Sequence, residues 1–244
     1  MIPNAQILYD VVDVTWPAAS LQKHTPWIIR DGKGGGKRVS AATVSGPINA
    51  AALLQAETQM HRLGQTPLFM IREGDQTLDT LLESQNYNVI DPVNMYAAPI
   101  NDVTNSALPP LSTFCIWEPL AIMADIWAAG GIGPKRQEVM NRATSPKTSL
   151  MGRSGDRPAS AGFVGLHNGV AMVHALEVLE KHRRQYLGRY MMQAAANWGV
   201  DNGAEFISAI CTKANVGACS LYSSLGMSIV GEYHYRIHPD GLAD

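Results

Sequence analysis

The residues with the clearest chemical potential lie between Leu176 and Tyr190, where an apolar segment is followed by a basic turn and a glycine opens a helical pattern. The first turn of a helix presents backbone N–H groups without intrahelical partners and the positive end of the helix dipole. Gly188 has no side chain, so the backbone can approach a bulky phosphate there. Three arginines add positive charge, namely Arg183, Arg184 and Arg189. The pattern predicts an anion site, and a solvated basic turn is the alternative.

This stretch resembles motif A of the GNAT superfamily of acyl-CoA-dependent N-acyltransferases, whose coenzyme loop reads Arg/Gln-x-x-Gly-x-Gly/Ala. Gln185 and Gly188 fit the motif, whereas Tyr190 stands where the family prefers a tiny residue. A tyrosine there either folds away or narrows the diphosphate pocket. The segment 212–237 resembles motif B, and the matching positions are Asn215, Ala218, Leu221, Tyr222, Gly226 and Met227. The two motifs together favour coenzyme binding over a solvated turn.

The resemblance implies that the chain uses acetyl-CoA as a co-substrate, without a metal. The positions that it assigns to the coenzyme are Val178, Leu179, Arg184, Gln185, Tyr186, Leu187, Gly188, Arg189, Tyr190 and Asn215. GNAT folds splay two strands at this point, and the pantetheine arm would pair with the strand through Val178. A backbone N–H near Val178 or Leu179 would then stabilise the oxyanion. Asn215 would cap a helix or bond the pantetheine.

The reaction implied by the resemblance is direct attack of an amine on the thioester. Tyr222 matches the family's tyrosine that protonates the leaving thiolate, and a core aromatic residue is the alternative. Glu177 and His174 lie on the expected central strand and could take the proton of the amine, directly or through water. They have opposite parity on a regular strand, so both face one side only if a β-bulge separates them. Ordered water without a single base is the alternative.

The expected acceptor is a primary amine of a small molecule or an amino-acid-like compound. The resemblance places its pocket at the segment from Trp127 to Pro134, together with Glu118 and the strand from Tyr233 to Tyr235. Glu118 either holds a cationic amine or is a solvated glutamate. Two other functions stay open at this point. One is a non-catalytic acyl-CoA-binding or sensory module, and the other is a protein or peptide N-acyltransferase.

The elements that must position these residues alternate along the second half of the chain. Expected strands span 114–117, 161–166, 171–179, 206–211 and 229–237, and expected helices span 120–129, 136–142, 187–198 and 218–225. The strand 171–179 is apolar at both parities, which is typical of a central buried strand. The helix 187–198 has its apolar residues on one face. This order predicts a mixed α/β (α+β) fold, a GNAT-like sheet flanked by helices.

The first half of the chain shows part of the same order. Expected strands span 27–30, 38–44, 68–71 and 89–97, and expected helices span 49–63 and 78–85. The polar segment 101–112, broken by Pro109 and Pro110, predicts a linker between a lobe 1–100 and an acetyltransferase domain 113–244. The glycine-rich segment 32–37 lacks the spacing of a phosphate-binding loop, so a flexible turn is expected there.

The two halves match at an offset of 140 residues, which aligns Leu82 with Tyr222. This correspondence predicts two tandem GNAT-like lobes, and coincidence between two α/β halves is the alternative. At the same offset, Ile48 stands in the place of Gly188. A β-branched residue there would block a phosphate, so the first lobe is expected to be a degenerate repeat.

Composition narrows the remaining functions. The 244 residues are 46% hydrophobic and 16% charged, which is typical of a globular protein. The net charge of -2 gives no reason to expect nucleic acid or an anionic membrane as a partner. No apolar run approaches the roughly 18 residues of a membrane helix, and no signal peptide is visible. Three cysteines without CxxC spacing favour free thiols and a cytoplasmic location. A homodimer is left open.

Overall fold

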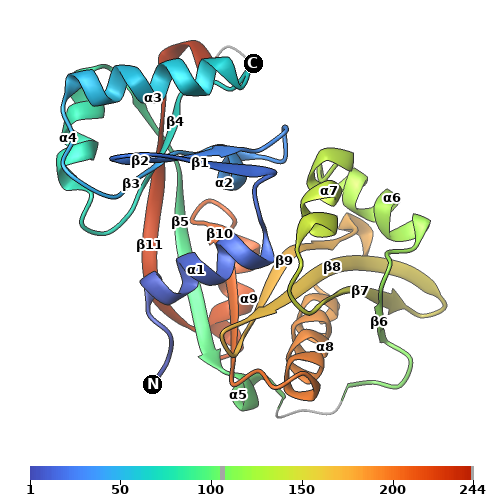
Figure 1. The fold of residues 1–244 in the computed structure, drawn as a ribbon. Helices are drawn as coiled ribbons and strands as arrows, with labels where there is room; N and C mark the ends of the chain where they lie inside the picture. Colours follow the sequence, from blue (N-terminus) through green and yellow to red (C-terminus); the bar gives the residue numbers. More distant parts are fainter. Residues whose placement is uncertain (105–107, 243–244) are drawn as a thin grey trace. The chain divides into compact units, whose positions relative to one another are not determined.

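The computed structural model describes residues 1–104 and 108–242 and divides into two compact units (Figure 1). The first holds Met1–Pro17, Met95–Cys211 and Asn215–Val230, and the second holds Ala18–Asn94, Thr212–Ala214 and Gly231–Asp244. Strands β5 (Asn88–Pro99) and β11 (Ser228–Ile237) each pass from one unit into the other. Because the units change over within strands, the lobes 1–100 and 113–244 stay a prediction.

The second unit combines a small antiparallel sheet with outer strands of a large mixed sheet. The small sheet has the order β1 (Ser20–His24), β2 (Trp27–Asp31) and β3 (Thr43–Val44). In the large sheet, β11 lies between β4 (Leu68–Ile71) and β5, and it is antiparallel to β4. The helices of this unit are α2 (Lys37–Ser40), α3 (Ala50–Arg62) and α4 (Gln76–Ser84), with a final 3-10 helix η2 (Pro239–Leu242).

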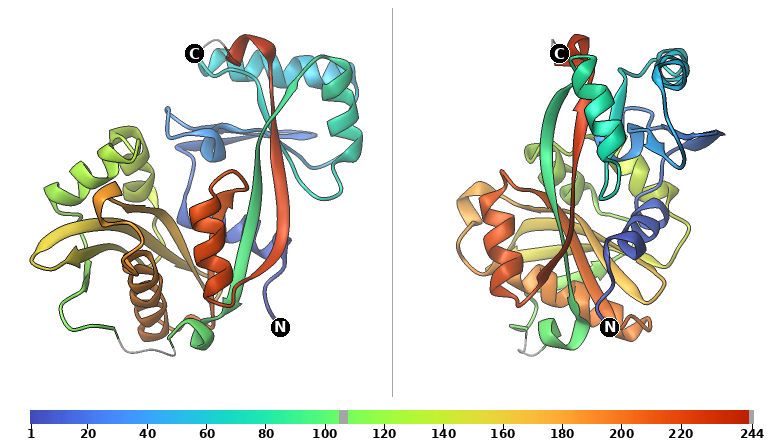
Figure 2. Two further views of the ribbon diagram at one scale, coloured as in Figure 1. Left: turned by 180° about the vertical axis from the view of Figure 1, so that it is seen from behind. Right: turned by 90° about the vertical axis from the view of Figure 1, so that its left-hand side faces the viewer.

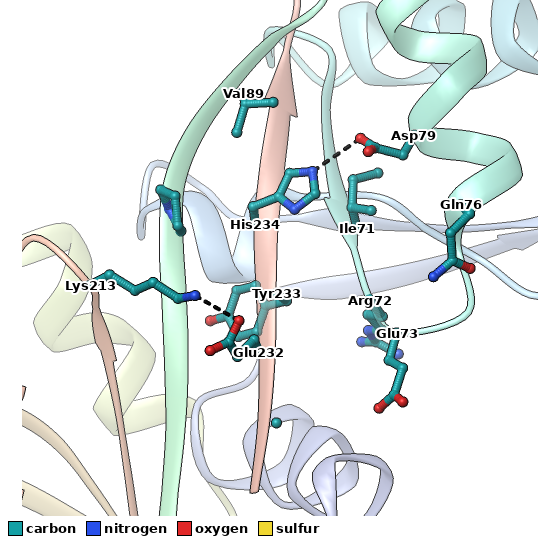
Figure 3. A pocket seen from close by; sticks show the side chains of 12 residues that line it. Ile71, Arg72, Glu73, Gln76, Asp79, Val89, Lys213, Glu232, Tyr233 and His234 are labelled. Carbon is teal, nitrogen blue, oxygen red and sulfur yellow. Dashed lines mark hydrogen bonds and ion pairs between the residues drawn. The ribbon is translucent and has the colours of Figure 1, made fainter. Parts of the chain in front are cut away.

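A charged network joins α4 to β11 in this unit. Oδ1 of Asp79 accepts a hydrogen bond from Nε of Arg236 at 2.7 Å and lies 3.0 Å from Nε2 of His234. Partial burial works to raise the pKa of Asp79, but the hydrogen bonds and charges of Arg236 and His234 outweigh it and lower that pKa. Asp79 and His234 border a cavity of about 490 Å³, where a second ion pair joins Lys213 to Glu232 (Figure 3).

We expect Asp79→Asn to lower the free energy of unfolding at pH 7 by about 1 to 3 kcal/mol, because the buried Arg236 would lose its charged acceptor. A carboxyl group whose pKa is lowered by folding stabilises the protein above its unfolded pKa of about 3.9. That contribution disappears as the pH falls towards the folded pKa, so the variant and the wild type should converge below about pH 4. Urea denaturation measures both effects, and Glu73→Gln removes an exposed carboxylate as the control. Equal stability of Asp79→Asn and wild type at pH 7 would contradict the network's role.

The first unit is built on the rest of the mixed sheet, in the order β11, β5, β10, β9, β8, β7, β6. Its further strands are β6 (Thr113–Ile116), β7 (Lys147–Ser154), β8 (Arg157–His167), β9 (Val170–Val178) and β10 (Phe206–Thr212). Strands β6 to β9 pair antiparallel, and β10 pairs parallel with β9. Its helices are α1 (Ala5–Thr15), α5 (Ile100–Thr104), α6 (Ala121–Ala129), α7 (Pro134–Arg142), α8 (Leu187–Asp201) and α9 (Val216–Ser224). The predicted mixed α/β fold is confirmed. None of the helices in the described ranges is long and apolar enough to cross a membrane.

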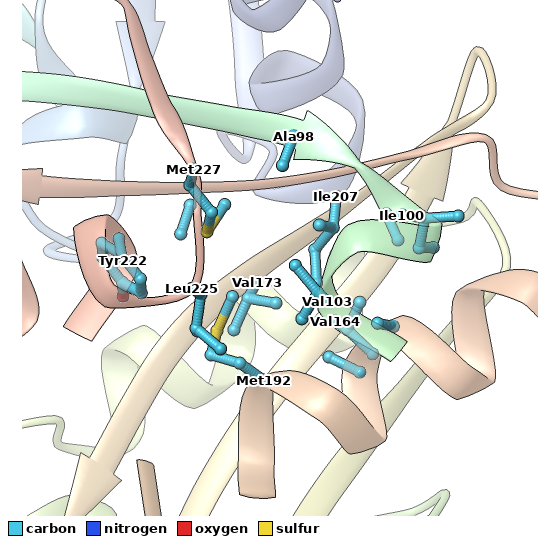
Figure 4. Close-up of a cluster of buried hydrophobic side chains, with 14 of the residues drawn as sticks. Ala98, Ile100, Val103, Val164, Val173, Met192, Ile207, Tyr222, Leu225 and Met227 are labelled. Carbon is cyan, nitrogen blue, oxygen red and sulfur yellow. The ribbon is translucent and has the colours of Figure 1, made fainter. Parts of the chain in front are cut away.

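Helices cover both faces of strands β7 to β9 in this unit. Figures 1 and 2 show α8 on one side of these strands and α6 on the other. On the α8 side, a buried apolar core includes Met192, Val173 and Ile207 (Figure 4). Each such side chain contributes about 1.5 to 3 kcal/mol to folding. On the other side, Gly165 lets α1 approach closely, because a β-carbon there would lie 2.8 Å from Cβ of Thr15.

The structure departs from the expected elements in three places. Residues 38–44, expected as a strand, hold α2 and only the short strand β3, and Oγ of Ser40 donates back to the carbonyl of Gly36. The first residues of the expected linker, from Asn101, belong to helix α5. This helix forms because Ile100 and Val103, nearly one helical turn apart, bury their side chains. Residues 105–107 of that linker lie outside the described residues. Helix α1 and strands β1 and β7 have no counterpart among the expected elements.

Candidate active site

Strands β9 and β10 separate partway along their length. Within the described chain, their parallel pairing joins residues 170–173 to residues 206–209 and extends no further. Strand β9 continues to Val178 and stays paired with β8 over that whole length. The later part of β9 therefore presents a backbone edge towards β10 that the sheet itself does not use. Such an edge can pair with an extended ligand, as the predicted splay requires.

A β-bulge lies between His174 and Glu177 on this part of β9. Glu177 pairs with Ala161 and His174 pairs with Phe163, so β9 takes three steps where β8 takes two. Ala175 adopts a left-handed backbone with a φ of 50°. The extra residue brings His174 and Glu177 to the same face of the strand. The condition under which both predicted bases share one face is met.

Glu177 is fixed in place by its neighbours. Its Oε1 lies 3.1 Å from Nη2 of Arg183, and its side chain is 17% exposed. The side chain also lies flush against the backbone that ends α6, because a β-carbon added at Gly130 would be 2.4 Å from Cδ of Glu177. It is the only acidic residue of the fully described strands β7, β8 and β9. Glu177 is thus an oriented carboxylate with access to solvent.

His174 is enclosed. Its side chain is 3% exposed, and its ring stacks on Trp16 at 5.0 Å. Its Nε2 lies 2.8 Å from Oγ1 of Thr15, and that hydroxyl donates its hydrogen to the carbonyl of Val11. Oγ1 of Thr15 must then accept the Nε2 proton of His174. The hydrogen bond from Nε2 of His174 to Thr15 helps to hold α1 on the sheet. His174 is 3% exposed and the side chain of Glu177 is 17% exposed, so Glu177 is the more accessible of the two predicted bases.

The two predicted oxyanion donors differ in their surroundings. The N–H of Leu179 donates to the carbonyl of Ala159 at 2.9 Å, so it is already bonded in the sheet. Hydrogen-bonded and non-bonded pairs alternate along an antiparallel ladder. Val178, opposite Ser160, therefore turns its N–H away from β8 and towards the splayed edge. Its carbonyl accepts a hydrogen bond from Nε of Arg183 at 3.0 Å.

The loop after β9 leads into an uncapped helix start. A 3-10 turn η1 (Glu180–His182) comes first, and then Arg184 and Tyr186 adopt left-handed backbones with φ of 62° and 64°. Tyr186 is the N-cap of α8, and no described side chain caps the helix. The N–H of Tyr190 makes a backbone bond to Tyr186 at 3.0 Å, so the amides of residues 187–189 precede the helical ladder. Such amides at the positive end of a helix fit a diphosphate.

The arginines of this loop have separate tasks. Nη2 of Arg189 donates to the carbonyl and Oγ of Ser224, so Arg189 caps the end of α9. Arg183 binds the end of β9 through Glu177 and the carbonyl of Val178. Arg184 is exposed. The sequence alone could not show which of the three arginines binds which partner, because their partners depend on the fold.

Gly188 has a packing reason for being glycine besides the predicted one. A β-carbon there would lie 3.0 Å from Cδ2 of Leu221 on α9. Gln185 makes only long contacts, to Oγ of Ser154 and the carbonyl of Lys181, both at 3.4 Å. The ring of Tyr190 lies 6.4 Å from that of Tyr186, which is 70% exposed. Tyr190 is half-buried beside the N-cap of α8, and both of its alternatives stay predictions.

Helix α9 carries the other predicted site residues. Oδ1 of Asn215 accepts a hydrogen bond from the N–H of Ala218 at 3.0 Å, so Asn215 caps the helix. Tyr222 is buried in the core of the first unit (Figure 4). Its ring lies 5.3 Å from that of Tyr96. The thiols of Cys211 and Cys219 lie 3.6 Å apart in or against the same core. No group of three His, Cys, Asp or Glu side chains within the described residues is arranged to hold a metal ion.

The residues predicted for the acceptor pocket belong to both units. Trp127 is fully buried, and its indole N–H donates to the carbonyl of Ala175 at 2.8 Å. Glu118 is exposed. Tyr233 and Tyr235 belong to the second unit and are buried there. Trp127 thus supports the bulge.

Comparison with known proteins connects this arrangement to one family. Residues 132–227 match the model of the acetyltransferase (GNAT) family. The matched segment includes β9, the loop after it, α8 and α9. The chain is also similar to the uncharacterized N-acetyltransferase YobR of Bacillus subtilis (strain 168). The two are 25% identical over 232 residues, which are 91% of this chain and 94% of that protein.

Two solved structures are similar in fold. One is a GCN5-related N-acetyltransferase from Kribbella flavida, with a TM-score of 0.69 and 17% identity, covering 98% of this chain and 96% of that chain. The other is a tandem GNAT protein from the clavulanic acid biosynthesis pathway, with a TM-score of 0.58 and 12% identity. That match covers 81% of this chain and 74% of the other.

Proposed function

We propose that the chain, whose residues 132–227 match the acetyltransferase (GNAT) family model, transfers an acetyl group from acetyl-CoA to the primary amine of a small molecule or amino-acid-like acceptor. One observation carries the proposal. The splayed edge of β9 leads through a single loop into the uncapped start of α8. An extended pantetheine arm can pair with such an edge while the amides of the helix start hold a diphosphate.

The proposed chemistry uses groups of the first unit. Glu177, directly or through water, takes a proton from the ammonium group, and the amine nitrogen then attacks the carbonyl carbon of the thioester. The N–H of Val178 stabilises the negative charge on the carbonyl oxygen. The C–S bond breaks and the hydroxyl of Tyr222 protonates the thiolate. The second proton of the nitrogen passes through water to the resulting tyrosinate, and the proton taken up by Glu177 is released to solvent. The products are an amide, free CoA and one released proton.

Binding and turnover are tested separately. Isothermal titration with acetyl-CoA is expected to show saturable binding, and thiol release is then followed over a panel of small amines and peptides. Release with at least one small amine supports the proposal. Binding without release on any panel member would favour a non-catalytic acyl-CoA-binding module. Release with peptides alone would favour a protein or peptide N-acyltransferase.

We expect Arg184→Ala to weaken acetyl-CoA binding about two- to five-fold, since an exposed ionic contact contributes up to about 1 kcal/mol. The reason is that Arg184 is exposed beside the helix start, whereas Arg183 and Arg189 are engaged elsewhere. Titration calorimetry measures the dissociation constant. Arg62→Ala removes an equally exposed arginine from α3 of the second unit and serves as the control. Equal affinity of the two variants would rule out a contribution from Arg184.

We also propose that the first half of the chain is a degenerate GNAT-like lobe. The helices α4 and α9 are both nine residues long, and their first residues, Gln76 and Val216, are 140 positions apart. A lobe with Ile48 in the place of Gly188 should not admit a phosphate. The calorimetric stoichiometry tests this directly. One acetyl-CoA per chain is expected, and two would contradict a degenerate first lobe.

A further inference from the structure

We infer that Trp127 is a positioning residue for Glu177, because its indole holds the β-bulge that decides which face of β9 this carboxylate occupies. The inference rests on the proposed function in one respect, which is that Glu177 acts on the acceptor amine. The bulge itself is independent of that function. Trp127 lies near the end of α6, fully buried, and its Nε1 donates to the carbonyl of Ala175 at 2.8 Å.

The bulge needs a partner to persist. Ala175 has a φ of 50°, a left-handed conformation that costs a residue with a β-carbon about 1 to 2 kcal/mol. Its carbonyl accepts a hydrogen bond from a side chain of another element, Trp127. Ala175 is half-buried, so its carbonyl would be only partly hydrated if the indole donor were removed. The hydrogen bond from the indole N–H of Trp127 thus helps to offset the free-energy cost of the bulge.

The bulge sets the direction of Glu177. His174 is anchored on the α1 side by Trp16 and Thr15, whereas Leu176 packs against the core on the α8 side. In a regular strand, a residue three positions after His174 would lie on the face opposite His174, where the apolar core packs against α8. The extra residue of the bulge returns Glu177 to the α1 and α6 side. A relaxed bulge would turn the carboxylate away from the acceptor.

Helix α6 contacts β9 a second time, at Glu177 itself. Gly130, three residues after Trp127, is the C-cap of α6 and has a φ of -91°, which any residue can adopt. The space for a β-carbon at Gly130 is taken by the Glu177 side chain, at 2.4 Å from Cδ. The end of α6 therefore holds the bulge through Trp127 and the carboxylate through Gly130. Gly130→Ala perturbs the second contact without touching the first.

Trp127→Phe keeps an aromatic ring and removes the N–H. We expect kcat to fall about ten-fold, because a misplaced catalytic group reacts slowly, while the dissociation constant of acetyl-CoA changes less than about two-fold. Gly130→Ala should give the same pattern. Trp27→Phe is the matched control, because Trp27 is 1% exposed and its Nε1 donates to the carbonyl of Ala52, also at 2.8 Å. It should lose comparable stability and keep its turnover.

Two further measurements decide the inference. In the Glu177→Gln background, Trp127→Phe should cause no additional loss of turnover, because it acts through the carboxylate. An equal loss in both backgrounds, or unchanged turnover in Trp127→Phe alone, would overturn the inference. A crystal structure of Trp127→Phe gives the readout that needs no activity. The bulge and Glu177 should be displaced in that structure, and an unchanged bulge would contradict the inference. Absence of thiol release by the wild-type protein would contradict only the proposed function.

Discussion

Glu177→Gln is expected to lower kcat by about 10²- to 10⁴-fold, the range by which a positioned general base accelerates a reaction. The amide keeps the shape of the side chain and its contact with Gly130, but it cannot accept the proton of the ammonium group. Affinity for acetyl-CoA should stay within about two-fold of wild type, because the proposed coenzyme contacts lie along the backbone of β9 and at the start of α8. Thiol release at saturating coenzyme and amine measures kcat, and calorimetry measures the affinity.

The control for this experiment is Glu205→Gln, which removes an exposed carboxylate outside the site at the start of β10. His174→Gln separates the two predicted bases. If Glu177→Gln keeps full turnover while His174→Gln loses it with unchanged stability, the base is His174. If both variants turn over normally, the proton passes to ordered water and neither residue is the base.

The strands and helices around the candidate site follow from local patterns in the sequence. Periodicity and turn residues predict β9, β10 and α9 within two residues and α8 within three, because each buries a face that its own residues define. Strand β7 was beyond such reasoning, since its sequence, KTSLMGRS, alternates weakly and becomes a strand by pairing with β6 and β8. Helix α1 is rich in β-branched residues, which favour strands. Its one local signal is Asn4, whose side chain accepts from the N–H of Ile7.

The candidate site could be predicted in its residue types but not in its pairings. The glycine, the basic loop and the tyrosine of α9 are visible as motifs. The partner of Arg189 is Ser224, 35 residues away, and a separation of that kind has no local signature. The N–H of Leu179 is bonded to Ala159 for the same reason, since only the register of β8 on β9 decides which amides face outward. The bulge that unites Glu177 and His174 could be stated only as a condition.

Tyr222→Phe is expected to lower kcat by about 10²-fold with little change in acetyl-CoA affinity, because the variant keeps the buried ring and loses only the hydroxyl that would protonate the thiolate. Tyr222 packs in the core against Tyr96, so its ring alone accounts for burial at this position. The ring is common to the variant and the wild type. A difference in turnover between them therefore reports on the hydroxyl.

Tyr96→Phe provides the matched comparison for that experiment, because Tyr96 is 2% exposed and its ring lies 5.3 Å from that of Tyr222 in the same core. Both variants remove one phenolic oxygen from the same region, so similar losses in the free energy of unfolding are expected. Only Tyr222→Phe should lose turnover. If Tyr222→Phe and Tyr96→Phe turn over equally fast, Tyr222 is a core aromatic residue, and the thiolate takes its proton from water.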